Sequence, residues 1–263
     1  MIAASRRYNN LLRSMPDEDF AALAPSLTLV DLARGDDVAQ PESRIRYSWF
    51  PVSGLISVVA TTGSGTQAEV GIVGREGMCP VATLHGVDTE MMHVYCQIPG
   101  RALRMPAPAL IAMIETRPAL RAHLLGYAHN FMVQVASSAL AYATQPIEAR
   151  LARWLLMSLD RIDSNDVALT HESFALMLGV RRAGVTVAIQ GLEAKGAVVG
   201  KRAVVTVINR ALLNDIAGEA YGAPERAYER FFGIALRDGA GGGAAGGAAS
   251  DGSGSAPIAG AGG

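Results

Sequence analysis

The spacing of apolar residues changes along the chain and separates it into regions. From Leu27 to about Met105, short alternating or β-branched runs are divided by glycine-containing turns such as Gly63–Gly65 and Gly74–Gly77. Several short strands with turn signals at this interval predict a β-barrel or β-roll. After Pro106 the apolar residues recur with a period of about 3.6, which is typical of helices.

Four helices are predicted around this change of period. Short helices are expected at Asp17–Ala24 and Ala109–Glu115. A long helix follows Pro118 and ends just before Pro146, because the residue before a proline avoids the helical region. The next segment, Ile147–Ile162, is amphipathic and predicts a fourth helix.

The long helix is apolar over a wide arc, with few charges after its first turn. Such a helix needs burial on more than one side, so we expect it to pack against the roll and against its twin in a second subunit. A single core helix in a monomer is the alternative. The side chains expected at the dimer interface follow one another at steps of three and four: Leu120, Leu124, Tyr127, Phe131 and Val135.

The segment from Thr170 to Val207 has the pattern of a helix-turn-helix. Ala175, Gly179 and Val185 stand at relative positions 0, +4 and +10. A small residue at Ala175 lets the second helix cross closely, Gly179 supplies a turn with positive φ, and Val185 fills the angle between the helices. Thr170 is the expected N-cap of the first helix.

A two-stranded wing is predicted directly after the second helix. Val198-Val199 and Ala203–Val207 are the two strands, and the polar residues Gly200–Arg202 form the turn between them. A brief helix at Arg210–Ala217 is expected to follow.

The net charge of −1 means that affinity for a polyanion must come from a local concentration of charge. Such a concentration runs from Arg181 to Arg210, where six basic residues accompany one acid, Glu193. A cationic helix beside a basic hairpin suits a phosphate backbone and a major groove. A helical hairpin that never touches nucleic acid is the alternative. The residues expected to contact DNA are Thr170, His171, Arg181, Arg182, Thr186, Gln190, Lys201 and Arg202.

Other function classes have little support in the sequence. Cys79 and Cys96 do not make a disulfide framework and fit a reducing cytoplasm. No run reaches the roughly 18 apolar residues that span a bilayer, and no signal peptide is recognisable, so a cytoplasmic protein is expected. The chain carries no Ser/His/Asp motif, P-loop or paired-carboxylate signature, so no enzyme activity is expected.

The C-terminal segment 234–263 is predicted to be disordered. From Gly239 to Gly263 there are 11 glycines in 25 residues, mixed with alanine and serine, and such a composition cannot bury apolar area. The segment is either a dispensable tail or a flexible tether.

The order of these parts resembles the Crp/Fnr family of bacterial transcription regulators, over nearly all of residues 10–220. Four collinear stretches carry the likeness: Ala33–Pro41, Trp49–Val59, Ala68–Met78 and Leu178–Gly196. The resemblance implies an α+β fold in three parts. They are an N-terminal jelly-roll (double-stranded β-helix) of the cyclic-nucleotide-binding type at 1–116, a dimerisation helix at 117–145, and a winged helix-turn-helix at 146–222.

The resemblance also implies a homodimer that reads a palindromic site on double-stranded DNA, with RNA polymerase as a further partner and no membrane. Arg182 falls where the family places a guanine-reading arginine, a phosphate contact being the alternative. Ala183 and Val187 stand where glutamate and a second arginine are common, so the operator is expected to differ from the family's best-known half-site. Arg181 and Thr186 are candidates to compensate. A signalling module whose helix-turn-helix makes protein contacts without reading DNA is the alternative function.

The resemblance places an effector pocket around Gly77–Cys96. In the family a glutamate there holds the ribose of a cyclic nucleotide and an arginine holds its phosphate. Here Pro80-Val81 and Met91–His93 occupy those positions. Without a fixed cation for the phosphate, cAMP binding is not expected, and the effector is unknown. The candidate pocket residues are Gly77, Met78, Cys79, Val81 and His93.

No metal or other cofactor is expected. An iron–sulfur cluster needs about four thiolates, and the chain has two cysteines. Cys79, His85, His93 and Cys96 are the only concentration of soft ligands, and their spacing matches no standard zinc finger. Ordinary packing of these side chains is the expectation.

Overall fold

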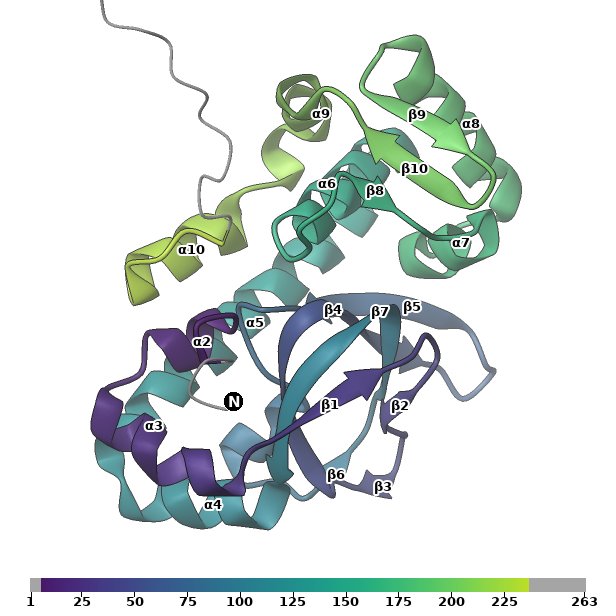
Figure 1. The fold of residues 1–263 in the computed structure, drawn as a ribbon. Helices are drawn as coiled ribbons and strands as arrows, with labels where there is room; N and C mark the ends of the chain where they lie inside the picture. Colours follow the sequence, from purple (N-terminus) through teal and green to yellow (C-terminus); the bar gives the residue numbers. More distant parts are fainter. Residues whose placement is uncertain (1–5, 237–263) are drawn as a thin grey trace, which may run out of the picture.

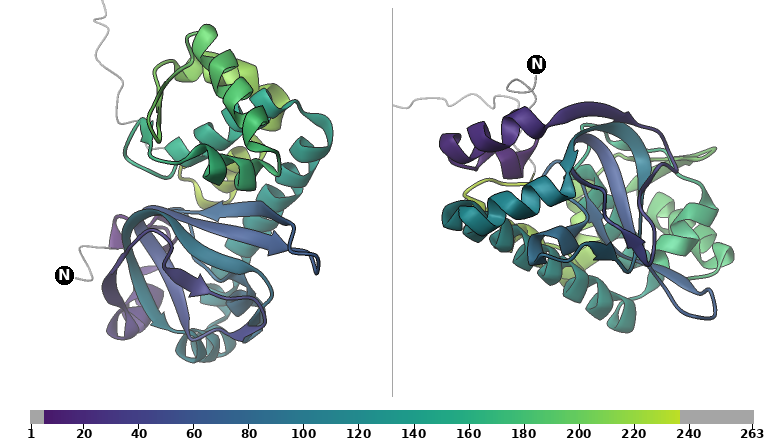
Figure 2. Two further views of the ribbon diagram at one scale, coloured as in Figure 1. Left: turned by 90° about the vertical axis from the view of Figure 1, so that its right-hand side faces the viewer. Right: turned by 90° about the horizontal axis from the view of Figure 1, so that it is seen from below.

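The computed structural model describes residues 6–236 of the 263-residue chain. Figure 1 shows an N-terminal β-roll below and a largely helical C-terminal domain above. The long helix α5 (Pro118–Thr144) runs along one side of the roll and leads to the upper domain, as the two views of Figure 2 also show. This is the α+β arrangement that the sequence predicts.

Antiparallel strands build the roll, and its main sheet has the order β1-β7-β4-β5, with β2 also paired to β7. The long strand β4 is rich in β-branched and aromatic residues, eight of its 15 residues, which favours extended backbone. A small ribbon of β3 and β6 lies apart from the main sheet. The strands are β1 (Thr28–Leu32), β2 (Asp37–Ala39), β3 (Ser43–Arg44), β4 (Tyr47–Thr61), β5 (Gln67–Val73), β6 (Thr89–Glu90) and β7 (His93–Pro106).

Short helices cover the ends and one side of the roll. Two of them agree with the sequence, since α3 and α4 lie at the predicted places, while α2 and the 3-10 helix η2 were not predicted. The helices are α2 (Asn10–Arg13), α3 (Asp17–Leu23), η1 (Ala24–Ser26), η2 (Val81–His85) and α4 (Ala107–Thr116).

The predicted dimer face of α5 is wrong, because the structure buries that face within the protomer. Leu120 and Leu124 are 0% exposed, Tyr127 is 1% and Phe131 is 7% exposed, and Val135 packs partly buried against the same core. These side chains close the open side of the roll, where Tyr127 lies against Gly77 and Phe131 lies against Gly71. Side chains already packed in this way have no surface to offer to a second subunit.

The opposite face of α5 is the exposed one. Met132 is 59% exposed and Leu140 is 64% exposed. Between and beyond them lie the exposed alanines Ala136, Ala139 and Ala143. The prediction that α5 is apolar on more than one side is therefore correct. The residues predicted for the dimer interface, however, lie on the side that packs against the roll.

The C-terminal domain contains the predicted helices and wing. Its core joins that of the roll, since Leu55 and Ile72 of the roll belong to the same apolar cluster as Leu151 and Phe174 of this domain. Its elements are α6 (Ile147–Leu159), β8 (Asp166–Val167), α7 (His171–Leu178), α8 (Arg182–Ala194), β9 (Val198–Lys201), β10 (Val204–Val207), α9 (Arg210–Ala217) and η3 (Gly218–Ala220).

A final helix, α10 (Ala223–Phe232), was not predicted and packs back against α5. Asn130 of α5 donates to the backbone oxygen of Pro224 at 2.8 Å. The Tyr228 hydroxyl donates to the backbone oxygen of Glu76 at 2.8 Å, so α10 contacts the roll as well. Its ring lies beside Phe232, with 4.5 Å between the ring centroids.

The predicted disordered segment, 234–263, lies outside the described residues except for its first three positions. There the prediction is wrong, because Leu236 is buried in the core of the roll and α5. Among residues 6–236, no helix combines the length and the hydropathy that crossing a bilayer requires.

Gly77→Ala is expected to destabilise the protein. A Cβ at this position would lie 2.1 Å from the Tyr127 ring, and neither the turn nor the buried ring has room to move. Overpacking of this kind lowers the free energy of unfolding by about 2 kcal/mol. Urea denaturation measures the change. Gly63→Ala is the matched control, since a Cβ there meets nothing within 4 Å; equal stability of the two variants would contradict the prediction.

Candidate nucleic-acid interface

The helix-turn-helix is formed as the spacing predicts. Gly179 ends α7 in the left-handed region, with φ +60°, and its backbone N–H closes the helix. A glycine adopts this conformation without the steric cost that a side chain imposes. Val185 is fully buried between the helices. At the other end of α7, the Thr170 hydroxyl accepts the backbone N–H of Ser173 at 3.2 Å, which confirms the predicted N-cap.

One face of α8 is exposed, and α8 lies at the outer edge of the domain (Figure 1). The exposed residues along this face are Arg182, Ala183, Val187 and Gln190. The buried face carries the apolar contacts to α6 and α7 through Val185, Ala188, Ile189 and Leu192. We call the first set the outer face of α8.

Arg182 forms an ion pair with Glu172 of the preceding helix, α7. Its Nε lies 3.0 Å from Oε1 of Glu172, and both side chains are mostly exposed. The pKa of Glu172 lies below its ordinary value, because its own backbone N–H in the first turn of α7 and the Arg182 guanidinium both favour the carboxylate. The contact with Glu172 is made through Nε, at the side of the guanidinium group.

Thr186 and His171 contact each other. The Thr186 hydroxyl lies 3.1 Å from Nδ1 of His171 and donates to the backbone oxygen of Arg182 at 3.3 Å. Thr186 therefore faces α7, at the edge of the outer face. His171, in the first turn of α7, is half-buried beside it.

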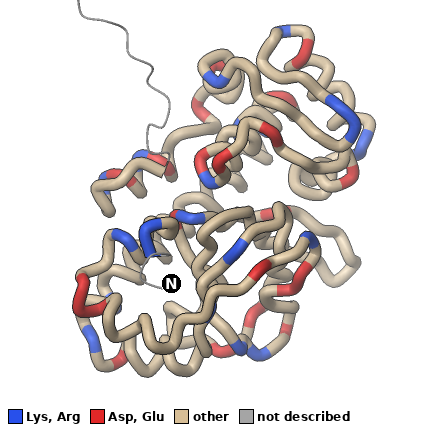
Figure 3. Tube along the Cα trace, viewed as in Figure 1, with Lys and Arg blue, Asp and Glu red and all other residues tan. Residues whose placement is uncertain are grey.

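The basic residues of this region fall into two groups. Lys195 pairs with Glu148, and Arg210 pairs with the buried Asp160 at 2.6 Å, so these two cations hold helices together. The remaining four are exposed: Arg181, Arg182, Lys201 and Arg202. In Figure 3 Lys and Arg positions gather at the right-hand edge of the upper domain.

The wing is a hairpin of β9 and β10, as predicted, but β8 adds a third strand to it. Lys201 and Arg202 are at its tip, and Ala203 completes the turn with a positive φ of 56°. Glu193 of α8 accepts the backbone N–H of Gly200 at 2.6 Å. This bond fixes the wing beside α8, so Lys201 and Arg202 of the wing lie on the same domain surface as Arg181 and Arg182.

Comparison with known proteins gives the same architecture. The model of the Crp-like helix-turn-helix domain family matches residues 149–216. No curated protein sequence matches the chain significantly.

Solved structures of Crp/Fnr regulators share the whole fold. A protein assigned to the crp/fnr family from Eubacterium rectale ATCC 33656 has 14% identity and a TM-score of 0.63, with 80% of this chain and 99% of that chain covered. FixK2 from Bradyrhizobium japonicum has 14% identity and a TM-score of 0.63, with coverage of 73% and 98%. A CRP-family transcriptional regulator from Thermus thermophilus has 18% identity and a TM-score of 0.62, with coverage of 74% and 99%.

Residues 149–216 are a Crp-like helix-turn-helix domain, in a chain with the Crp/Fnr fold. The resemblance that the sequence indicates is therefore confirmed.

Two buried carboxylates attach the Crp-like domain to the roll, and the sequence did not single out either one. Glu76, in the turn after β5, pairs with Arg161 after α6; the two atoms are 2.8 Å apart and the side chains 2% and 1% exposed. Burial lowers the pKa of Arg161, but the nearby carboxylates of Glu76, Glu225 and Asp160 together raise it by more, so its pKa lies above its ordinary value. The sequence did carry a signal for these buried acids, because Glu69 and Glu76 lie within an otherwise largely apolar stretch.

Glu69 of β5 is the second carboxylate. Trp154 of α6 donates to its Oε1 at 2.5 Å, and Ser57 and Gln97 of the roll donate to its Oε2. Burial outweighs these hydrogen bonds and raises the pKa of Glu69 to about 7. A carboxyl group that titrates near neutrality thus lies between the two domains.

The candidate effector pocket is a cavity of about 290 Å³ between the roll, η2 and α5. Cys79 and Val81 line it as predicted. Three predicted residues do not. Gly77 lies under Tyr127, Met78 is in the core, and His93 turns outward to Asp37, with Nε2 2.7 Å from Oδ1.

The lining of this cavity is mostly apolar and includes no Lys or Arg. Glu90 is its one carboxylate, and Oε1 of Glu90 already accepts the backbone N–H groups of Met91 and Met92 at 2.8 and 3.0 Å. Met132, on the exposed face of α5, forms part of the wall. The cavity therefore suits an apolar group better than a phosphate.

The predicted soft ligands are dispersed. Cys79 and Cys96 are buried free thiols, and burial raises the pKa of Cys96 to about 11. Throughout the described part of the chain, no three His, Cys, Asp or Glu side chains come close enough to hold a metal ion.

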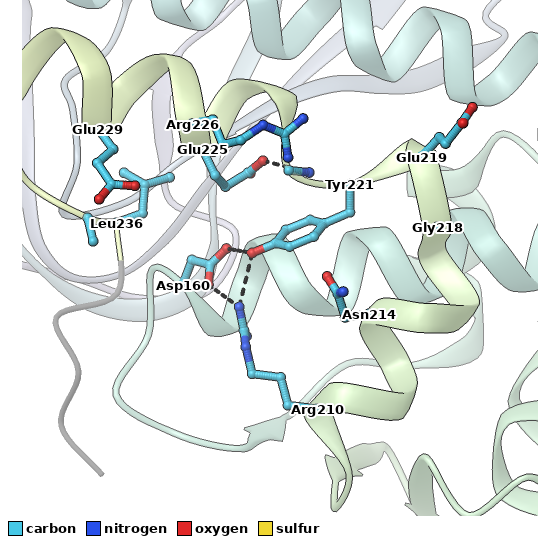
Figure 4. A pocket seen from close by; sticks show the side chains of 12 residues that line it. Asp160, Arg210, Asn214, Gly218, Glu219, Tyr221, Glu225, Arg226, Glu229 and Leu236 are labelled. Carbon is cyan, nitrogen blue, oxygen red and sulfur yellow. Dashed lines mark hydrogen bonds and ion pairs between the residues drawn. The ribbon is translucent and has the colours of Figure 1, made fainter. Parts of the chain in front are cut away.

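A second cavity, of about 600 Å³, lies between α6, α9 and α10 (Figure 4). Arg210 donates to Asp160 at 2.6 Å and to the Tyr221 hydroxyl at 3.0 Å, and that hydroxyl donates to Asp160 at 2.5 Å. These hydrogen bonds connect the Crp-like domain to the segment that leads into α10. We assign this network a structural role.

The pKa of Glu69 predicts a pH-dependent stability. The folded-state pKa of about 7 exceeds the ordinary value of 4.5 for the free group, so the folded state binds more protons between these pH values. The free energy of unfolding should therefore fall as pH rises from about 4.5 to 7 and level off above 7, by up to about 3 kcal/mol. Urea denaturation at pH 5 and pH 8 measures the fall.

Glu69→Gln should flatten this dependence, because the amide stays neutral throughout. Glu18→Gln, at an exposed position, is the matched control and should follow the wild type. Parallel curves for the wild type and Glu69→Gln would show that Glu69 does not titrate in this range.

Proposed function

We propose that the protein is a sequence-specific transcription regulator that binds a palindromic DNA site as a homodimer. The observation that carries the proposal is the joint surface of the outer face of α8 and the wing tip, where Arg182, Lys201 and Arg202 are exposed and Arg181 precedes the helix. The match of residues 149–216 to the Crp-like helix-turn-helix domain supports it. The same match favours regulation over catalysis, and contact with RNA polymerase stays a prediction from the resemblance.

The exposed cations of the wing and the exposed Arg182 of α8 have different expected roles. Lys201 and Arg202 extend from the wing tip beside α8, where phosphates flank a major groove, so they are expected to position the protein on any sequence. Arg182 is in the first turn of α8, which is the part of a recognition helix that meets base edges. Because Glu172 contacts Arg182 through Nε and the Arg182 side chain is 68% exposed, we expect Nη1 and Nη2 to donate together to O6 and N7 of a guanine.

The exposed face of α5 is the proposed dimer interface. Leu125, Met132, Ala136, Ala139 and Ala143 follow one another at steps of seven, four, three and four, which is the spacing of a coiled-coil seam. Alanines on this seam allow two helix backbones to approach closely. Pairing of the two α5 helices would present two copies of α8 to two half-sites of a palindrome.

The cavity next to α5 is the proposed effector site. Its mostly apolar lining supports a small, largely apolar effector. Because no Lys or Arg lines the cavity to bind a phosphate, cAMP is not expected to bind there. Met132 belongs both to the cavity wall and to the proposed seam, so an effector there would touch the dimer interface directly. No resident cofactor is proposed.

Arg182→Ala should reduce specific DNA binding by about ten-fold or more, while binding to scrambled DNA changes little. The reason is that a bidentate arginine–guanine contact contributes about 1–3 kcal/mol of discrimination. Fluorescence anisotropy with a selected palindromic duplex, across a salt series, measures both affinities. Lys201→Ala, a phosphate contact, should weaken both DNAs equally and reduce the salt slope by about one.

Arg44→Ala is the control for charge alone, since Arg44 is exposed on the roll, far along the chain from the motif. If Arg182→Ala weakened both DNAs equally, Arg182 would be a phosphate contact. If the wild type showed no salt-dependent DNA binding, the alternative function, protein contact without DNA readout, would be favoured.

Met132→Glu combined with Leu140→Glu should convert the dimer into monomers, because one carboxylate would lie in the proposed seam and the other beside it on the same exposed apolar face of α5. Sedimentation velocity gives the mass directly. Met91→Glu is the matched control, since Met91 is 66% exposed but lies on the roll. A wild-type monomer, or a dimer that survives both substitutions, would overturn the proposed interface.

A further inference from the structure

The outer face of α8 has an apolar centre. Val187 is 68% exposed and lies one turn after Ala183 and just before Gln190 along this face. In a helix, residues three and four apart share a face, so these three side chains and Arg182 form one continuous surface. Within α7 and α8, Val187 is the large apolar side chain that remains exposed.

Val187 has no part in the core of the domain. The neighbouring Val185 and Ala188 point inward and are buried, and Ile189 and Leu192 complete that side. The fold is therefore satisfied without Val187. A solitary exposed valine is common on protein surfaces, but this one lies where the proposed function brings the floor of a major groove.

The chemistry of the groove limits what Val187 can contact. The amino, carbonyl and ring-nitrogen groups of the bases lose water without gaining a hydrogen bond when an alkyl side chain covers them. The C5-methyl group of thymine is the apolar feature that the major groove presents. Ala183 adds a second small, apolar side chain one turn away, which leaves room for a methyl group to approach.

We propose that Val187 recognises a thymine through its C5-methyl group, on the same half-site whose guanine Arg182 contacts. The inference rests on the proposed function and specifies its operator. It makes Val187 a specificity-determining residue that works by apolar contact, at a position where a charged side chain would read a different base.

The test removes the methyl group and nothing else. A palindromic duplex is first selected from a randomised library with the full chain, and each thymine of the half-site is then replaced in turn by deoxyuridine. Fluorescence anisotropy gives the affinity of each duplex. At one position, deoxyuridine should weaken wild-type binding about four-fold, the value of burying one methyl group. Val187→Ala should bind thymine and deoxyuridine at that position equally.

One control variant and one folding measurement accompany this experiment. Arg44→Ala, away from α8, should keep the full sensitivity to deoxyuridine. The circular dichroism and unfolding midpoint of Val187→Ala should match the wild type, because the side chain is exposed.

The outcomes separate this inference from the proposed function. If the wild type binds a selected palindrome but deoxyuridine lowers the affinity at no position, the proposed function stands and the inference is overturned. The inference is also overturned if Val187→Ala stays as sensitive to deoxyuridine as the wild type. If no duplex is selected at all, both are overturned.

Discussion

The structure depends on two carboxylates that are buried where the roll meets the Crp-like domain. Glu76 is paired with Arg161 and Glu69 accepts the indole N–H of Trp154, so each acid from β5 or its turn has its partner on or just after α6. A buried charge without its partner is far more costly than an exposed one, so these pairs allow only a narrow range of domain orientations. That constraint fixes the direction in which α8 and the wing face, and hence the surface on which the proposed DNA contact depends.

The long helix α5 connects this orientation to the rest of the molecule. Its inner side closes the roll through Tyr127 and Phe131, and its outer side, with Met132 and Leu140, is open. The unpredicted helix α10 returns from the Crp-like domain to pack on α5 and the turn at Glu76. The Crp-like domain is therefore attached to α5 at both of its ends, before α6 and after α9.

The roll encloses a cavity with a mostly apolar lining. The cavity against α5 is lined by no Lys or Arg. Oε1 of its single carboxylate, Glu90, accepts two backbone N–H groups. The proposed input is therefore apolar, and the wall residue Met132 places it in contact with the proposed dimer seam. The outer face of α8 also differs from the pattern that the resemblance implies. It carries Arg182, but the exposed Val187 stands where a second arginine is common.

The sequence by itself determined the features that depend on residues close together in the chain. The spacing of Ala175, Gly179 and Val185, the N-cap at Thr170 and the basic wing turn identify the motif because turn geometry and helix crossing are local constraints. Tertiary structure decided which arc of α5 meets the roll, because a helix that is apolar all round has a pattern that fits either face. It also decided the partners of Glu69 and Glu76, the packing of α10 and which residues line the cavity. Many of these contacts join segments far apart in the chain, as the separation of 85 residues between Glu69 and Trp154 illustrates, and no local spacing encodes them.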